Sequence, residues 1–198
     1  SLHMLEQAVR FAKRCQQQGF ELSVAVNLSV HNLRDERLAE QVAEILGRHD
    51  LEASLLGLEL TESAIMNDPE QSLGILTELQ AMGVQLSIDD FGTGYSSLSY
   101  LKRLPVAELK IDRSFVHDMI EDNDNAMIVR STIDLAHNLG LATVAEGVES
   151  MEILDVLQSM HCDMAQGYLI SRPLPEQEFL DFLASSEWAK HTRSRNRA

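Results

Sequence analysis

The chain has 198 residues, with 16 Lys and Arg against 31 Asp and Glu, so its formal net charge is −15. Its 44% hydrophobic and 24% charged residues are typical of a globular protein and exclude intrinsic disorder. The acidity argues against a nucleic-acid duplex or an anionic membrane as the main partner, because both attract basic surfaces. No apolar stretch reaches the roughly 18 residues of a membrane span, and two distant cysteines favour a reducing compartment.

Strands and helices are predicted to alternate along the chain. Helices are expected over residues 2–19, around 38–46, over 69–82 and 98–104, in a long stretch that ends at 140, and over 151–160 and 176–183. Strands are expected over residues 22–28, 55–60, 84–88, 108–111, 142–145 and 164–165. This alternation predicts an α/β domain with a parallel sheet and helices outside it, over residues 1–186. Residues 187–198 carry four basic residues and one Glu and are expected to form a mobile tail.

A polar side chain stands at or near the end of each predicted strand. These residues are Asn27, Glu59, Asp89, Asp90, Lys110, Asp112, Glu146 and Gln166. Because the carboxyl ends of parallel strands share one edge, we expect these side chains to lie together. The alternative is a set of separate helix caps and salt bridges at the rim of the sheet.

The residue types suggest one kind of chemistry. Carboxylate and amide oxygens are the ligands that Mg²⁺ and Mn²⁺ prefer, and divalent cations would offset the repulsion between clustered carboxylates. Lys110 adds a cation suited to a phosphate oxygen or to an attacking water. The set therefore predicts metal-assisted hydrolysis of a phosphate ester.

The segments that carry these residues also resemble a known family. AVNLS, LELTES, IDDFGTGYSSLSYLKRLPVAELKIDRSFV, VAEGVES and QGYLISRPLP are similar to the EAL domain, the bacterial cyclic di-GMP phosphodiesterase family, and the likeness runs from about Leu2 to Phe182. The resemblance implies a TIM-type (β/α)8 barrel that hydrolyses cyclic di-GMP to linear 5′-pGpG with two Mg²⁺ or Mn²⁺ ions. It also implies a cytoplasmic bacterial location, as the C-terminal part of a larger signalling protein, with no membrane contact by the domain itself.

The resemblance assigns roles residue by residue. The implied metal ligands are Asn27, Glu59, Asp89, Asp90 and Glu146. Lys110 and Glu149 would be catalytic, with Lys110 positioning or deprotonating the water, and Gln166 would support the site. Asp112 and Arg113 would lie near the substrate. Glu62 would hold the turn from Gly92 to Ser97, which includes Thr93 and in the family lies at a dimer interface, so a homodimer is expected.

One family motif is missing from the sequence. The Glu-Ala-Leu segment that names the family, with its metal-ligating Glu and phosphate-binding Arg, should precede the first helix and is absent. Six predicted strands are also two fewer than a closed barrel needs. We therefore expect an N-terminally truncated TIM-type barrel with about six βα units. The alternative function is a catalytically impaired EAL-type module that acts as a cyclic di-GMP receptor or protein-interaction domain, and a different metal-dependent barrel enzyme is a third candidate.

Overall fold

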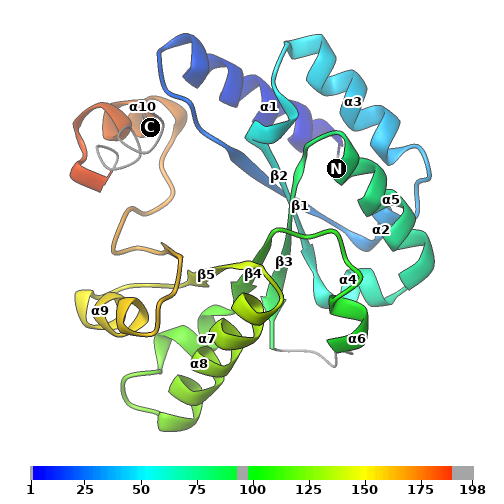
Figure 1. Cartoon of the computed structure of the whole chain (residues 1–198). Helices are drawn as coiled ribbons and strands as arrows, with labels where there is room; N and C mark the ends of the chain where they lie inside the picture. The colour runs from blue at the N-terminus through cyan, green and yellow to red at the C-terminus, as the bar shows by residue number, and fades with distance from the viewer. Residues whose placement is uncertain (1, 93–97, 189–198) are drawn as a thin grey trace.

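The computed structural model describes residues 2–92 and 98–188, and its centre is a six-stranded parallel sheet (Figure 1). Each strand pairs with the next in the chain, in the order β1 (Val24–Leu28), β2 (Leu56–Thr61), β3 (Gln85–Phe91), β4 (Glu108–Ile111), β5 (Ala142–Glu146) and β6 (Met164–Gln166). This order confirms the predicted arrangement of six βα units from a TIM-type barrel.

Helices follow the strands and lie around the outside of the sheet (Figure 1). They are α1 (Leu2–Gln17), α2 (Val30–Leu33), α3 (Leu38–His49), α4 (Glu62–Met66), α5 (Pro69–Ala81), α6 (Leu98–Leu101), α7 (Arg113–His117), α8 (Asn123–Asn138), α9 (Met151–Ser159) and α10 (Glu176–Ser185), with a short 3-10 turn at Ala53–Leu55. Three of these, α2, α4 and α7, were not predicted from the sequence. Each follows a strand directly and has only four or five residues, which is too short for a helical hydrophobic period to appear.

Local signals explain where the longer helices begin. The Asp68 side chain accepts a hydrogen bond from the backbone N–H of Gln71, and Pro69 occupies the first position of α5. In the same way, the Ser150 hydroxyl accepts from the backbone N–H of Ile153 at the start of α9. These caps fix the point at which each chain segment turns away from the sheet.

The two faces of the sheet differ in character. In β2, Leu56, Leu58 and Leu60 are fully buried beneath the helices, whereas Glu59 and Thr61 alternate with them and are partly exposed on the other face. Because side chains alternate along a strand, one face builds the apolar core and the other collects polar groups. The candidate site lies on this second face.

The last helix packs on the first. Cys15 of α1 forms a small apolar cluster with Leu180 and Leu183 of α10, separate from the main core. The rings of Phe11 and Phe179 join it with centroids 5.6 Å apart. Figure 1 shows α10 beside α1, on the far side of the sheet from α8. This contact therefore joins α10, near the end of the described residues, to α1 at their beginning.

Within the described residues, no helix combines the length and the apolar character needed to cross a membrane. The tail predicted to be mobile lies, from residue 189 onward, outside the described residues.

Candidate active site

The centre of the site is a buried lysine surrounded by carboxylates from three other strands. The Nζ atom of Lys110 in β4 lies 2.8 Å from Glu59 Oε1, 3.3 Å from Asp89 Oδ1 and 2.6 Å from Glu146 Oε1. The side chain of Lys110 is only 5% exposed. Side chains from β2, β3, β4 and β5 therefore meet at one point, as their spacing in the sequence predicted.

The expectation that these residues lie at or near strand ends holds, but the predicted end of β3 needs a correction. Lys110 is the third of four residues in β4, as predicted, whereas β3 continues through Asp89 and Asp90 to Phe91, beyond its predicted end at residue 88. The side chains meet because they share one face of the sheet near its carboxyl edge. The alternating pattern, more than the terminal position, brings them together.

Asp90 breaks the alternation of β3. The register between β3 and β4 shifts between Ile88 and Phe91, and Asp90 has a left-handed φ of +53°. Its backbone N–H donates to the Asp89 carboxylate at 3.1 Å. A bulge of this kind redirects a side chain, and here it lets two consecutive carboxylates serve the same edge.

Burial and neighbouring charges shift the protonation of the site. Burial alone disfavours a charged lysine, but hydrogen bonds to Glu146 and Glu59 outweigh it and raise the pKa of Lys110. Burial raises the pKa of Glu146 despite its bond to Lys110. Burial, then the charge of Asp89, raises the pKa of Asp90. The single positive charge of Lys110 therefore does not neutralise the surrounding carboxylates.

The donor set fits a divalent cation. Oxygen atoms of Asp89, Asp90 and Glu146 all lie within 4.8 Å of one another. Together with Glu59 they are four carboxylates around one ammonium, a formal surplus of three negative charges. Hard oxygen donors with uncompensated charge are what Mg²⁺ and Mn²⁺ require.

Two neutral predicted residues flank the carboxylates. Asn27 on β1 is in register with Glu59, and Gln166 on β6 is in register with Glu146, and both are exposed. They extend the polar face to the two outermost strands of the sheet.

Glu108 was missed by sequence reasoning, although it lies two residues before Lys110 on the same face of β4. Burial, and then the charge of Glu59, raise the pKa of Glu108. Strand alternation was the signal that could have revealed it.

Asp112 has a second role besides its place near the site. It is the N-cap of α7 and accepts from the backbone N–H of Ser114 at 2.9 Å. Burial opposes its ionisation, but the hydrogen bonds from Ser114 lower its pKa. It is also close enough to Asp90 to contribute to the raised pKa of that carboxyl, after burial and the charge of Asp89. The capping alternative is therefore right for Asp112, which nonetheless remains in contact with the carboxylate cluster.

The remaining predicted residues lie next to this cluster or outside the described part. Arg113 and Glu149 line an adjoining hollow. Glu62 begins α4 and is 6% exposed, and among the residues that the structure describes its Oε1 atom has no hydrogen-bond partner. Thr93 lies outside the described residues, as do the other residues of the turn from 93 to 97 that Glu62 was expected to hold.

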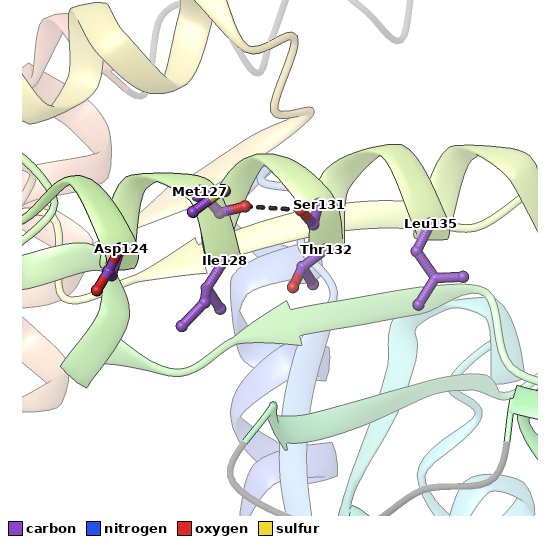
Figure 2. A pocket seen from close by; sticks show the side chains of 6 residues that line it. All are labelled: Asp124, Met127, Ile128, Ser131, Thr132 and Leu135. Carbon is purple, nitrogen blue, oxygen red and sulfur yellow. Dashed lines mark hydrogen bonds between the residues drawn. The ribbon is translucent and has the colours of Figure 1, made fainter.

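A second hollow lies on the outer surface of α8 (Figure 2). All six lining residues belong to this helix, and Met127 and Ile128 are large apolar side chains that are 59% and 38% exposed. Ser131 also lines the hollow, and its hydroxyl donates to the backbone carbonyl of Met127 at 2.7 Å. This apolar row is distinct from the polar face of the sheet.

Comparison with known proteins places the chain. A model of the EAL domain matches residues 1–173. This chain belongs to the EAL domain family. The predicted resemblance is thereby confirmed.

Named relatives and solved structures agree with the family assignment. The chain is 49% identical over 162 residues to the bifunctional diguanylate cyclase/cyclic di-GMP phosphodiesterase MucR of Pseudomonas aeruginosa, covering 82% of this chain and 24% of the relative. It is 43% identical over 198 aligned residues to the cyclic di-GMP phosphodiesterase NbdA of the same species, covering 98% of this chain and 25% of the relative. The chain thus spans about a quarter of the length of these relatives.

Among solved structures, the PaMucR phosphodiesterase in complex with c-di-GMP superposes with a TM-score of 0.87 at 45% identity, covering 90% of this chain and 72% of that one. A manganese/cy-diGMP complex of Klebsiella pneumoniae BlrP1 superposes with a TM-score of 0.80 at 31% identity, covering 88% of this chain and 44% of that one.

Proposed function

We propose that this EAL domain hydrolyses cyclic di-GMP to linear 5′-pGpG, with two Mg²⁺ or Mn²⁺ ions, in bacterial second-messenger signalling. The observation that carries the proposal is the convergence of Glu59, Asp89 and Glu146 on Lys110, with Asp90 turned toward the same edge by its bulge. The related cyclic di-GMP phosphodiesterase NbdA, and the similar structures that were solved as c-di-GMP and manganese/cy-diGMP complexes, support the substrate and the cofactor.

The chemistry follows from the residues in the site. We assign the two ions to the oxygen donors of Glu59, Asp89, Asp90, Glu146 and Asn27. Bound there, divalent ions would supply Lewis acidity and a water of lowered pKa. The Lys110 ammonium donates hydrogen bonds at the centre of the ring, so we assign it the positioning of the water or of a phosphate oxygen. Glu149, in the loop after β5, and Gln166, the last residue of β6, would support the arrangement.

We also propose that the domain forms a homodimer. Met127 and Ile128 on α8 are exposed apolar side chains that a second copy could cover, with the small, exposed Ser131 beside them allowing close approach (Figure 2). Sedimentation equilibrium of the purified chain measures this assembly directly, and a monomer at all concentrations would contradict it.

The test of the activity is a product assay with the purified chain. We expect Mn²⁺-dependent conversion of cyclic di-GMP to pGpG, measured by chromatography, and a loss of about a thousandfold or more in Glu59→Gln. Glu21→Gln, which changes an exposed Glu outside the site, is the matched control and should retain the normal rate.

The outcomes separate the candidate functions. A chain that binds cyclic di-GMP but forms no product would favour the receptor alternative. A near-normal rate in Glu59→Gln would contradict the assignment of this carboxylate as a metal ligand.

A further inference from the structure

Glu108 lies below Lys110 on the polar face of the sheet. These are the first and third residues of β4, and side chains alternate along a strand, so both point to the same face. Their Cα positions are about 6.5 Å apart along the strand. Glu108 is in register with Ala142, four residues before Glu146 in β5. It therefore lies farther from the carboxyl edge of the sheet than Glu146 does.

The Glu108 carboxylate lacks a partner of its own. Among residues 2–92 and 98–188 its side chain makes no hydrogen bond or ion pair, and its neighbours in register, Ser87 and Ala142, carry no charge. The side chain is partly buried. Burial, followed by the charge of Glu59, raises the pKa of Glu108, whereas the charge of Lys110 lowers it. Glu108 is thus within electrostatic reach of the lysine without a direct ion pair to it.

The Lys110 ammonium depends on carboxylates that the proposed function also assigns to metal ions. An ammonium has three donors, and Glu59, Asp89 and Glu146 each have an oxygen within 3.3 Å of Nζ. Divalent ions bound to the same carboxylates would compete for their lone pairs and repel the ammonium. A buried lysine that lost these partners would need another acceptor to stay charged. Glu108 offers one on the same face of the same strand.

We infer that Glu108 is a positioning residue, whose carboxylate accepts a hydrogen bond from the Lys110 ammonium when divalent ions occupy the site. Rotation about side-chain bonds suffices to bring the two groups together, because both lie on one face of β4. The inference rests on the proposed function for the metal ions and for the role of Lys110. It deepens that function by naming the group that keeps the ammonium charged and in place beside the substrate phosphate.

Calorimetric titration of the purified chain with Mn²⁺, without substrate, tests the inference independently of turnover. Glu108→Met removes the acceptor oxygens and keeps a side chain of similar length. We expect it to weaken Mn²⁺ binding by about tenfold, because the ammonium then has no alternative to the carboxylates that bind the ions. The metal-free variant should melt no lower than the wild type, since the carboxylate that it lacks has no partner there. Glu78→Met, at an exposed position of α5, is the matched control and should bind Mn²⁺ like the wild type.

A double variant shows whether Glu108 acts through Lys110. In Lys110→Met there is no ammonium to hold, so the addition of Glu108→Met should leave the dissociation constant for Mn²⁺ nearly unchanged. Glu108→Gln, which retains one acceptor oxygen without the charge, should recover part of the loss seen in Glu108→Met. In the product assay, Glu108→Met should lower kcat by about tenfold and leave KM nearly unchanged, because Lys110 is assigned to the reacting groups.

The outcomes separate the positioning role from the activity. Wild-type Mn²⁺ binding in Glu108→Met, or an equal loss when Lys110→Met is also present, would overturn the role of Glu108 even if the wild-type chain hydrolyses cyclic di-GMP. Weakened binding that disappears with Lys110→Met would support it, even if no pGpG forms and the proposed activity fails. A wild-type chain that does not bind Mn²⁺ would contradict the proposed metal site and the role of Glu108 together.

Discussion

The Lys110 ammonium supplies positive charge to the surrounding carboxylates, as a bound divalent cation would. Its ammonium contacts three carboxylates and is buried, so the cost of removing it from water is offset by direct ion pairs on three sides. Removal of one partner from such a group leaves buried charges without compensation, which is more costly than loss of a surface pair. The same residue is therefore important for both folding and chemistry.

We predict that Lys110→Met abolishes measurable turnover and lowers the free energy of unfolding of the metal-free chain by about 3 kcal/mol, because three carboxylates lose their shared cation. Mn²⁺ should then raise the melting temperature of the variant more than that of the wild type, since the ion replaces the missing charge. Thermal melting with and without Mn²⁺ measures both effects.

The matched control for this change is Lys102→Met, which alters an exposed lysine. It should show the wild-type stability and the wild-type response to Mn²⁺. If Lys110→Met gained no more from Mn²⁺ than the control, the electrostatic account of the ring would be wrong.

At the scale of elements, one contact joins three segments at the end of the sheet opposite the site. Asp163, just before β6, accepts hydrogen bonds from the backbone N–H and the hydroxyl of Thr143 in β5, both at 2.8 Å. It also pairs with His137 near the end of α8 at 2.9 Å. This carboxylate thus fixes the start of the short β6 against its neighbours.

Stability should depend on pH through this contact. Burial opposes ionisation of Asp163, but its hydrogen bonds from His137 and Thr143 lower its pKa below the ordinary 3.8. Its contribution is therefore complete above about pH 4 and is lost as the pH falls through the lower folded-state pKa. We predict that Asp163→Asn is less stable than the wild type at pH 7 and that this gap narrows steadily below pH 4.

Urea unfolding at a series of pH values measures the gap. Asp155→Asn, at an exposed position of α9, is the control and should differ little from the wild type at any pH. A gap for Asp163→Asn that is constant from pH 7 to pH 3 would show that its charge does not contribute.

The elements themselves could be predicted to different degrees. The strands were placed within a few residues because each combines an apolar run with flanking turn signals, as at Gly83 before β3. The site edge followed from the alternation of strands and helices. The bulge at Asp90 could not be predicted, because it depends on how β3 and β4 fit together. The pairing of Lys110 with three particular carboxylates likewise requires the register of four strands.

At the scale of the whole molecule, the strand pairs of the sheet and the contact between α10 and α1 differ in how far apart in the sequence the contacting residues are. Every strand pairs with its neighbour in sequence, whereas the ion pair of Arg14 with Glu176 joins residues 162 positions apart. Contacts across such a distance close a long loop, at a larger entropic cost than shorter loops carry. Contacts between neighbouring βα units close shorter loops and carry less of this cost.

This difference in sequence separation predicts an order in which the contacts form during folding. We predict that contacts between α1 and α10 form after the rate-limiting step, so Phe179→Ala should speed unfolding while leaving the refolding rate nearly unchanged. Leu58→Ala, in the buried face of β2, should instead slow refolding. Stopped-flow measurements in urea distinguish the two, and a slowed refolding of Phe179→Ala would contradict the prediction. The contacts of the last helix would then determine the lifetime of the folded state, and the contacts between the strands would determine the rate of folding.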